Sequence, residues 1–119
     1  MFDPIILLKV LWIMESGLQH NPANGKDGEV GPYQITQACL QDVNDFRGTR
    51  LTLEDCRKLS VARWVVISYL ERWNAVYDYE SACRTWNGGP NGMYKEATLA
   101  YWNRCKNLIK MLENDRDGK

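Results

Sequence analysis

The sequence predicts one mostly helical domain of the α+β class, and three observations support this prediction. The chain of 119 residues is long enough to bury a single hydrophobic core. Several segments place apolar residues three or four positions apart, which predicts amphipathic helices. Residues 20–35 instead concentrate Asn, Gly, Asp and Pro, which predicts a small lobe formed by a short hairpin or an irregular loop. We expect one domain over residues 1–113 and a polar, frayed tail over residues 114–119.

The first two helices are predicted from their capping residues. Asp3 is a favoured N-cap and Pro4 suits the first helical position, so a helix should begin there and reach about Leu18. Thr36 is expected to cap a second, short helix after the loop-rich segment. The apolar positions of that second helix are Cys39, Leu40 and Val43.

Three further helices are predicted in the second half of the chain. The residues "TLED" at 52–55 resemble a capping box ahead of a long helix that reaches about Trp73. Its middle, "VARWVVISYL", is apolar on more than one face, which predicts the buried central helix. A shorter helix over about 79–86 ends at the loop "NGGPNG", and a final helix is expected over about 96–112. Four tryptophans are expected in or near the core, namely Trp12, Trp64, Trp73 and Trp102.

Composition argues against several classes of function. Fifteen basic and fifteen acidic residues balance, whereas nucleic-acid binding needs a concentrated basic surface. The N-terminal run "IILLKVLWIM" is too short to cross a bilayer and has no signal-peptide cleavage pattern, so we expect no membrane insertion. The four cysteines form no CxxC pair and His20 is the only histidine, so a metal site is not expected. Free thiols and one or two disulfides both remain open.

Glu15 is the residue that carries the strongest chemical signal. It shares the apolar face of the first helix with Leu8 and Leu11. Desolvation on such a face raises the pKa of a carboxyl group, which can then donate a proton near neutral pH. Asp27 follows twelve residues later in a polar loop, where solvent favours the charged form. Two carboxyl groups in such different surroundings suit the cleavage of a glycosidic bond, with Glu29 as the alternative second carboxylate.

Other residues are candidates for binding a sugar chain. Gly31 permits close approach of the backbone, and Gln34 offers both a hydrogen-bond donor and an acceptor. A stacking face or a hydroxyl near Glu15 is expected from Tyr33, Trp86 and Tyr101, and exposed amides from Asn87, Gly88 and Gly89. The glycines and amides are equally explained by turns and helix ends, and the aromatic residues by core packing.

Three blocks of the sequence resemble the signature blocks of the lysozyme superfamily. They are "ES" at 15–16, "GPYQI" at 31–35 and "WNGGPNGMYKEATLAYW" at 86–102. The third is especially similar to invertebrate-type lysozymes, and the first two are shared with lytic transglycosylases and goose-type lysozymes. The resemblance extends over about residues 8–108 and implies a lysozyme-like fold. It makes Glu15 the general acid, matches Asp27 to the aspartate of the invertebrate-type enzymes, and places Ser16 in the substrate site.

The resemblance implies a peptidoglycan-cleaving glycosidase. Such an enzyme cuts the β-1,4 bond between N-acetylmuramic acid and N-acetylglucosamine without a cofactor, and we expect it to act as a monomer. It would act at the bacterial cell wall, after secretion, in the periplasm or delivered by a phage. Two alternatives remain: a lytic transglycosylase that uses Glu15 alone, and a catalytically silent wall-binding or virion structural domain. The low number of cysteines, and Trp86 where the invertebrate-type enzymes usually have histidine, depart from that pattern.

Overall fold

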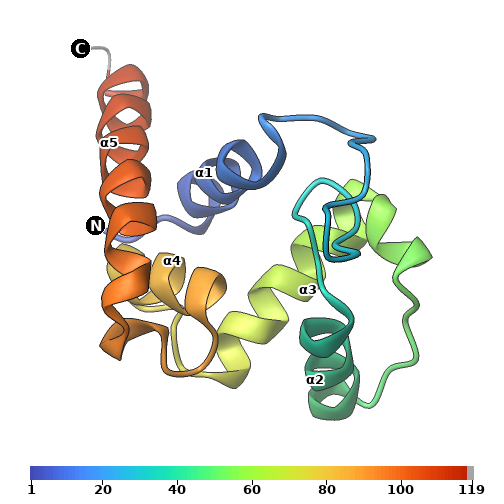
Figure 1. The fold of residues 1–119 in the computed structure, drawn as a ribbon. Helices are drawn as coiled ribbons and strands as arrows, with labels where there is room; N and C mark the ends of the chain where they lie inside the picture. Colours follow the sequence, from blue (N-terminus) through green and yellow to red (C-terminus); the bar gives the residue numbers. More distant parts are fainter. Residues whose placement is uncertain (118–119) are drawn as a thin grey trace.

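A computed structural model describes residues 1–117, which form five α-helices joined by loops and short 3-10 turns (Figure 1). The mostly helical character that the sequence predicts is confirmed. The described residues contain no β-strand, and a single isolated antiparallel bridge joins Val30 to Ile35 where a hairpin was the alternative. The small lobe is therefore an irregular loop, and the α+β class is corrected to all-α over this range. The helices are α1 (Pro4–Ser16), α2 (Gln37–Arg47), α3 (Leu59–Arg72), α4 (Tyr79–Gly88) and α5 (Leu99–Arg116).

Helix α1 begins as predicted and ends slightly earlier. The Asp3 side chain accepts a hydrogen bond from the backbone N–H of Ile5 at 2.9 Å, and Pro4 occupies the first turn. Gly17 ends the helix because its backbone adopts the left-handed conformation, with φ of 65°. Leu18 lies beyond this cap and is exposed, so the helix does not reach the predicted end at Leu18.

The capping box forms, but it caps a different element. Thr52 and Asp55 exchange hydrogen bonds at 2.8 and 3.2 Å, and they precede the 3-10 turn η1 (Glu54–Arg57). Lys58 is extended, which separates η1 from α3 and delays the long helix to Leu59. Helix α3 also has an outer face on which Trp64 is exposed, so the expected burial of Trp64 is wrong.

The later helices follow the prediction with shifted ends. Asp78 caps α4 by accepting a 2.7 Å hydrogen bond from the N–H of Ser81. The 3-10 turns η2 (Gly92–Tyr94) and η3 (Glu96–Thr98) come before α5, which starts at Leu99 instead of residue 96. Because α5 continues to Arg116, residues 114–116 of the expected tail are helical, and residues 118–119 lie outside the described range.

Helix α3 runs between α2 and α4 and connects the two sides of the molecule (Figure 1). Apolar side chains from all five helices form one core around it. Each fully buried leucine or valine contributes roughly 1.5–3 kcal/mol to stability. No helix within residues 1–117 is long and apolar enough to span a bilayer. Fully buried members of the core include Leu7 and Leu11 of α1, Leu40 and Val43 of α2, Val65, Val66 and Leu70 of α3, and Cys83 and Cys105 of α4 and α5.

All four cysteines are free thiols, which answers the question that the sequence left open. Cys56, Cys83 and Cys105 are buried, and Cys39 is half-buried. Cys83 and Cys105 are hydrogen-bonded to each other. This hydrogen bond and burial raise the pKa of the Cys83 thiol. These side chains behave as small hydrophobic residues of the core.

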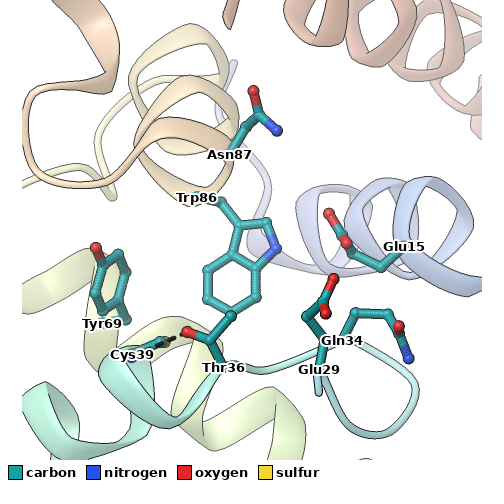
Figure 2. A pocket seen from close by; sticks show the side chains of 8 residues that line it. All are labelled: Glu15, Glu29, Gln34, Thr36, Cys39, Tyr69, Trp86 and Asn87. Carbon is teal, nitrogen blue, oxygen red and sulfur yellow. Dashed lines mark hydrogen bonds between the residues drawn. The ribbon is translucent and has the colours of Figure 1, made fainter. Parts of the chain in front are cut away.

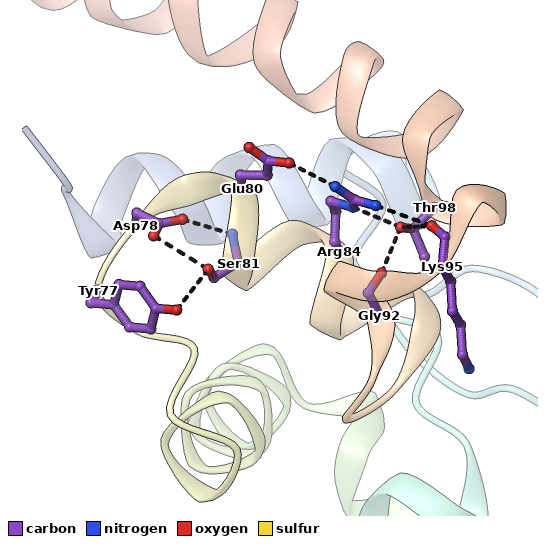
Figure 3. Close-up of polar contacts among 8 residues, drawn as sticks. All are labelled: Tyr77, Asp78, Glu80, Ser81, Arg84, Gly92, Lys95 and Thr98. Atoms are coloured by element: carbon purple, nitrogen blue, oxygen red, sulfur yellow. Dashed lines mark hydrogen bonds and ion pairs between the residues drawn. The ribbon is translucent and has the colours of Figure 1, made fainter.

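A polar network around Arg84 attaches the segment after α4 to the helices (Figure 3). The guanidinium group of Arg84 is buried and donates to the Thr98 hydroxyl at 2.8 Å, to the Glu80 carboxylate at 2.7 Å and to the Lys95 carbonyl at 3.1 Å. The Thr98 hydroxyl lies 2.8 Å from the carbonyl oxygen of Gly92, to which it donates. A buried guanidinium group needs such partners, and the network holds the "NGGPNG" loop against α4 and η3.

Candidate active site

Glu15 lies in the last turn of α1 and faces a cavity (Figure 2). Leu11, one turn earlier, is fully buried, which places Glu15 at the edge of the core. The hydroxyl of Tyr101 in α5 donates a 2.7 Å hydrogen bond to its Oε2 atom. The carboxyl group is therefore half-buried and held in one orientation.

The pKa of Glu15 is raised above its ordinary value, as its place in the apolar face predicts. The main cause is desolvation by burial, which disfavours the charged form. Hydrogen bonding by Tyr101 and the Trp86 indole opposes this effect, and the nearby charge of Glu29 adds to it. A carboxyl group in this state can keep its proton closer to neutral pH and donate it to a bound molecule.

The cavity beside Glu15 has a volume of about 220 Å³. It continues into a second cavity of about 430 Å³, with which it shares five residues. The two form one groove, which falls within the range of about 300–1,000 Å³ typical of ligand pockets. The first part is lined by Glu15, Glu29, Gln34, Thr36, Cys39, Tyr69, Trp86 and Asn87, and the second adds Ala38, Asp42, Gly89 and Pro90.

The carboxyl group that lines the first cavity together with Glu15 is that of Glu29, whereas Asp42 lines the second cavity and Asp27 lines neither. Asp27 is exposed at the tip of a turn that Gly28 closes with a φ of 87° and a hydrogen bond to the carbonyl oxygen of Gly25. Its backbone N–H points back to the Glu29 carboxylate, at 2.8 Å. The turn directs Asp27 to solvent, so Asp27 does not form a carboxyl pair with Glu15 in the cavity.

Three candidate sugar-binding residues near the "GPYQI" segment have structural roles instead. Gly31 has a φ of 81°, and a Cβ atom there would lie 2.2 Å from the carbonyl oxygen of Cys56, so the close approach is to the protein's own backbone. Tyr33 is fully buried and donates a 2.6 Å hydrogen bond to the Leu8 carbonyl. The Ser16 hydroxyl donates to the Pro32 carbonyl at 2.8 Å, which joins α1 to this segment.

Gln34 is the residue of this segment that lines the groove. Its backbone has a positive φ of 51°, and its side-chain amide donates a 2.9 Å hydrogen bond to the Gly31 carbonyl. The side-chain oxygen lies near Gly25. Gln34 therefore shares a cavity with Glu15 (Figure 2).

The "NGGP" segment offers the groove one side-chain amide and no free helix-end amides. The N–H of Gly89 is bonded to the Thr85 carbonyl at 2.9 Å, and Asn87 and Gly88 belong to α4. A Cβ atom on Gly88 would meet the Thr98 methyl group at 2.5 Å, so Gly88 is required for packing. The expectation that this segment exposes backbone amides is therefore wrong. The side chain of Asn87 does line the groove.

The groove is also lined by three residues that the sequence did not mark as site residues, namely Thr36, Cys39 and Tyr69. From the sequence, Thr36 was expected to cap a helix, and Cys39 and Tyr69 to lie at apolar helix positions. Tyr69 packs edge-on against Trp86, with ring centroids 5.8 Å apart and an interplanar angle of 85°. Burial raises the pKa of the Cys39 thiol to about 12, so it is a poor nucleophile. No sequence signal separates Tyr69 from the apolar residues that surround it in α3.

Within residues 1–117, no three His, Cys, Asp or Glu side chains gather in an arrangement that could hold a metal ion. Comparisons of the chain with protein-family models, with curated proteins and with solved structures find no match. The site is therefore interpreted from its own geometry, which combines one half-buried carboxyl group, a second carboxyl group and an aromatic and amide wall.

Proposed function

We propose that the protein is a lysozyme-like glycosidase that cleaves the β-1,4 bond between N-acetylmuramic acid and N-acetylglucosamine in the peptidoglycan of the bacterial cell wall. The observation that carries the proposal is Glu15, a carboxyl group with a raised pKa that opens onto a groove. The resemblance of the three sequence blocks supports the choice of substrate.

Glu15 acts as the general acid. Its proton moves to the glycosidic oxygen while the bond from that oxygen to the anomeric carbon breaks, and the bonding electrons remain on the oxygen. The sugar carbon develops positive charge as this bond breaks. A water molecule then adds to that carbon and gives up one proton, which restores the protonated Glu15. The Tyr101 hydrogen bond stabilises the carboxylate that remains on Glu15 after the proton has left.

The groove walls supply contacts suited to amino sugars. Trp86 and Tyr69 present aromatic surface, which packs against the apolar faces of sugar rings. Asn87 and Gln34 carry side-chain amides, which can both donate to and accept from hydroxyl and acetamido groups. The groove therefore combines stacking and hydrogen bonding beside the acid.

The test is digestion of purified peptidoglycan with the wild type and with Glu15→Gln, followed by mass spectrometry of the products. General acid catalysis contributes about 10²- to 10⁴-fold, so Glu15→Gln should lose most activity. Glu96→Gln, at an exposed glutamate of η3, serves as the matched control and should retain full activity. Full activity of Glu15→Gln would contradict the proposal.

A lytic transglycosylase is the second candidate. It is favoured by the position of Asp27, which lies in solvent and leaves Glu15 without the aspartate partner of the invertebrate-type lysozymes. The same mass spectra distinguish the two reactions. Hydrolysis adds one water to each cleaved bond, whereas transglycosylation releases a 1,6-anhydro sugar without added water.

A further inference from the structure

We propose that Glu29, which lines the same cavity as Glu15, stabilises the positive charge that develops on the anomeric carbon as the glycosidic bond breaks. This inference rests on the proposed function. It replaces Asp27, the aspartate that the family resemblance selects, with a residue two positions later.

The placement of Glu29 is the first argument. Its side chain lines the same cavity as Glu15 and points into the space between Glu15 and Trp86 (Figure 2). Its charge raises the pKa of Glu15, which requires the two groups to lie close enough to interact. Asp27 neither lines the cavity nor contributes to the Glu15 pKa.

The loop holds the Glu29 carboxylate in a defined position. The backbone N–H of Asp27 donates a 2.8 Å hydrogen bond to Oε1, and this bond leaves Oε2 for the groove. The Glu29 carbonyl accepts a 2.8 Å hydrogen bond from the Gly25 N–H, and Val30 pairs with Ile35 directly after it. Asp27 thus contributes through its backbone and not through its side chain.

Gly25 makes room for this carboxylate. A Cβ atom at position 25 would lie 2.8 Å from the Cδ atom of Glu29 and 2.8 Å from Oε1 of Gln34. Only glycine lets the loop close over the carboxylate without displacing it. A preorganised charge of this kind stabilises a transition state without reorganising when the reaction occurs.

The first experiment measures the Glu15 pKa directly and needs no substrate. The side-chain carboxyl carbon of Glu15 is followed by ¹³C NMR across pH in the wild type, Glu29→Gln and Asp27→Asn. We expect the Glu15 pKa to fall in Glu29→Gln and to stay unchanged in Asp27→Asn. A fall in Asp27→Asn but not in Glu29→Gln would overturn the assignment.

The second experiment measures hydrolysis of purified peptidoglycan by the same variants. We expect kcat to fall about 10²-fold in Glu29→Gln with little change in KM, and to stay within about twofold in Asp27→Asn. In Glu29→Gln the amide oxygen can still accept the hydrogen bond from the Asp27 N–H, so the variant removes the charge and keeps this bond. Glu29→Asp keeps the charge and should retain part of the activity. Circular dichroism of each variant reports whether the fold is preserved.

The outcomes separate this inference from the proposed function. Loss of activity in Glu15→Gln with full activity in Glu29→Gln overturns the role of Glu29 and leaves the proposed function intact. Cleavage to 1,6-anhydro products that is insensitive to Glu29→Gln also overturns the role of Glu29, and it assigns the reaction to the second candidate, the lytic transglycosylase. A wild type that cleaves no glycan overturns the proposed function, and the role of Glu29 with it.

Discussion

The hydroxyl of Tyr101 in α5 donates a 2.7 Å hydrogen bond to Oε2 of Glu15, which lies 86 residues earlier in the chain. This bond lowers the pKa of Glu15, while burial, the larger effect, raises it. Burial, and after it the charge of Glu15, raise the pKa of Tyr101, so the hydroxyl keeps its proton and remains a donor. The two residues together determine the pH at which Glu15 loses its proton.

Replacing Tyr101 by phenylalanine should raise the Glu15 pKa further, because the hydrogen bond that favours the charged form is lost. The high-pH limb of the pH–rate profile for peptidoglycan cleavage should move to higher pH, with a fall in kcat of about tenfold from the loss of a bond to a charged group. Carboxyl-carbon NMR of Glu15 measures the same shift without substrate. Tyr94→Phe, at a strongly exposed tyrosine, should change neither quantity, and a lower Glu15 pKa in Tyr101→Phe would contradict the prediction.

Replacing Glu15 by glutamine should stabilise the protein at neutral pH. The folded-state pKa of Glu15 lies above its ordinary value of 4.5, so ionisation costs more in the folded chain than in the unfolded one. Below about pH 4.5 both states hold the proton and there is no penalty. As the pH rises through the folded-state pKa, the wild type loses stability that Glu15→Gln retains.

The difference in free energy of unfolding between Glu15→Gln and the wild type should therefore grow from about pH 4 to pH 7. Urea unfolding followed by circular dichroism at several pH values measures it. Glu96→Gln, at an exposed position, should show no such dependence. A difference that shrinks with rising pH would mean that Glu15 is better stabilised when charged.

Alanine substitutions at Gly31 and Gly28 allow the cost of a steric clash to be measured separately from the cost of backbone strain. Both have a positive φ, of 81° and 87°, but a Cβ atom would clash with the Cys56 carbonyl at Gly31 and meet nothing within 4 Å at Gly28. Gly28→Ala should cost about 1–2 kcal/mol of stability, and Gly31→Ala roughly 3 kcal/mol or more. Equal costs in urea unfolding would show that the contact with Cys56 does not constrain position 31.

Thr98 tests the network that attaches the "NGGPNG" loop. Thr98→Val removes the acceptor of the Arg84 hydrogen bond and the donor to Gly92, so it should lower the free energy of unfolding by about 2 kcal/mol. Thr98→Ser keeps the hydroxyl and should recover much of this loss. Urea titration compares the two variants. A Thr98→Val protein as stable as the wild type, together with a destabilised Thr98→Ser, would assign the role of Thr98 to the methyl group that lies beside Gly88.

The sequence by itself determined the features that depend on neighbours within a turn or two of the chain. Asp3, Thr36 and Asp78 begin helices because each side chain caps a backbone N–H two or three residues ahead. Glu15 sits at the edge of the core because helical periodicity places it in line with Leu11, and its raised pKa follows from that burial.

The tertiary structure alone decided which residues share the groove. Both Asp27 and Glu29 belong to one polar loop, and only the turn at Gly28 and the closure over Gly25 direct one to solvent and the other to Glu15. Burial of Tyr33 and the contact of Gly31 with Cys56 likewise depend on segments far apart in sequence. Such contacts arise from packing of the whole chain, so no local pattern of residues reports them.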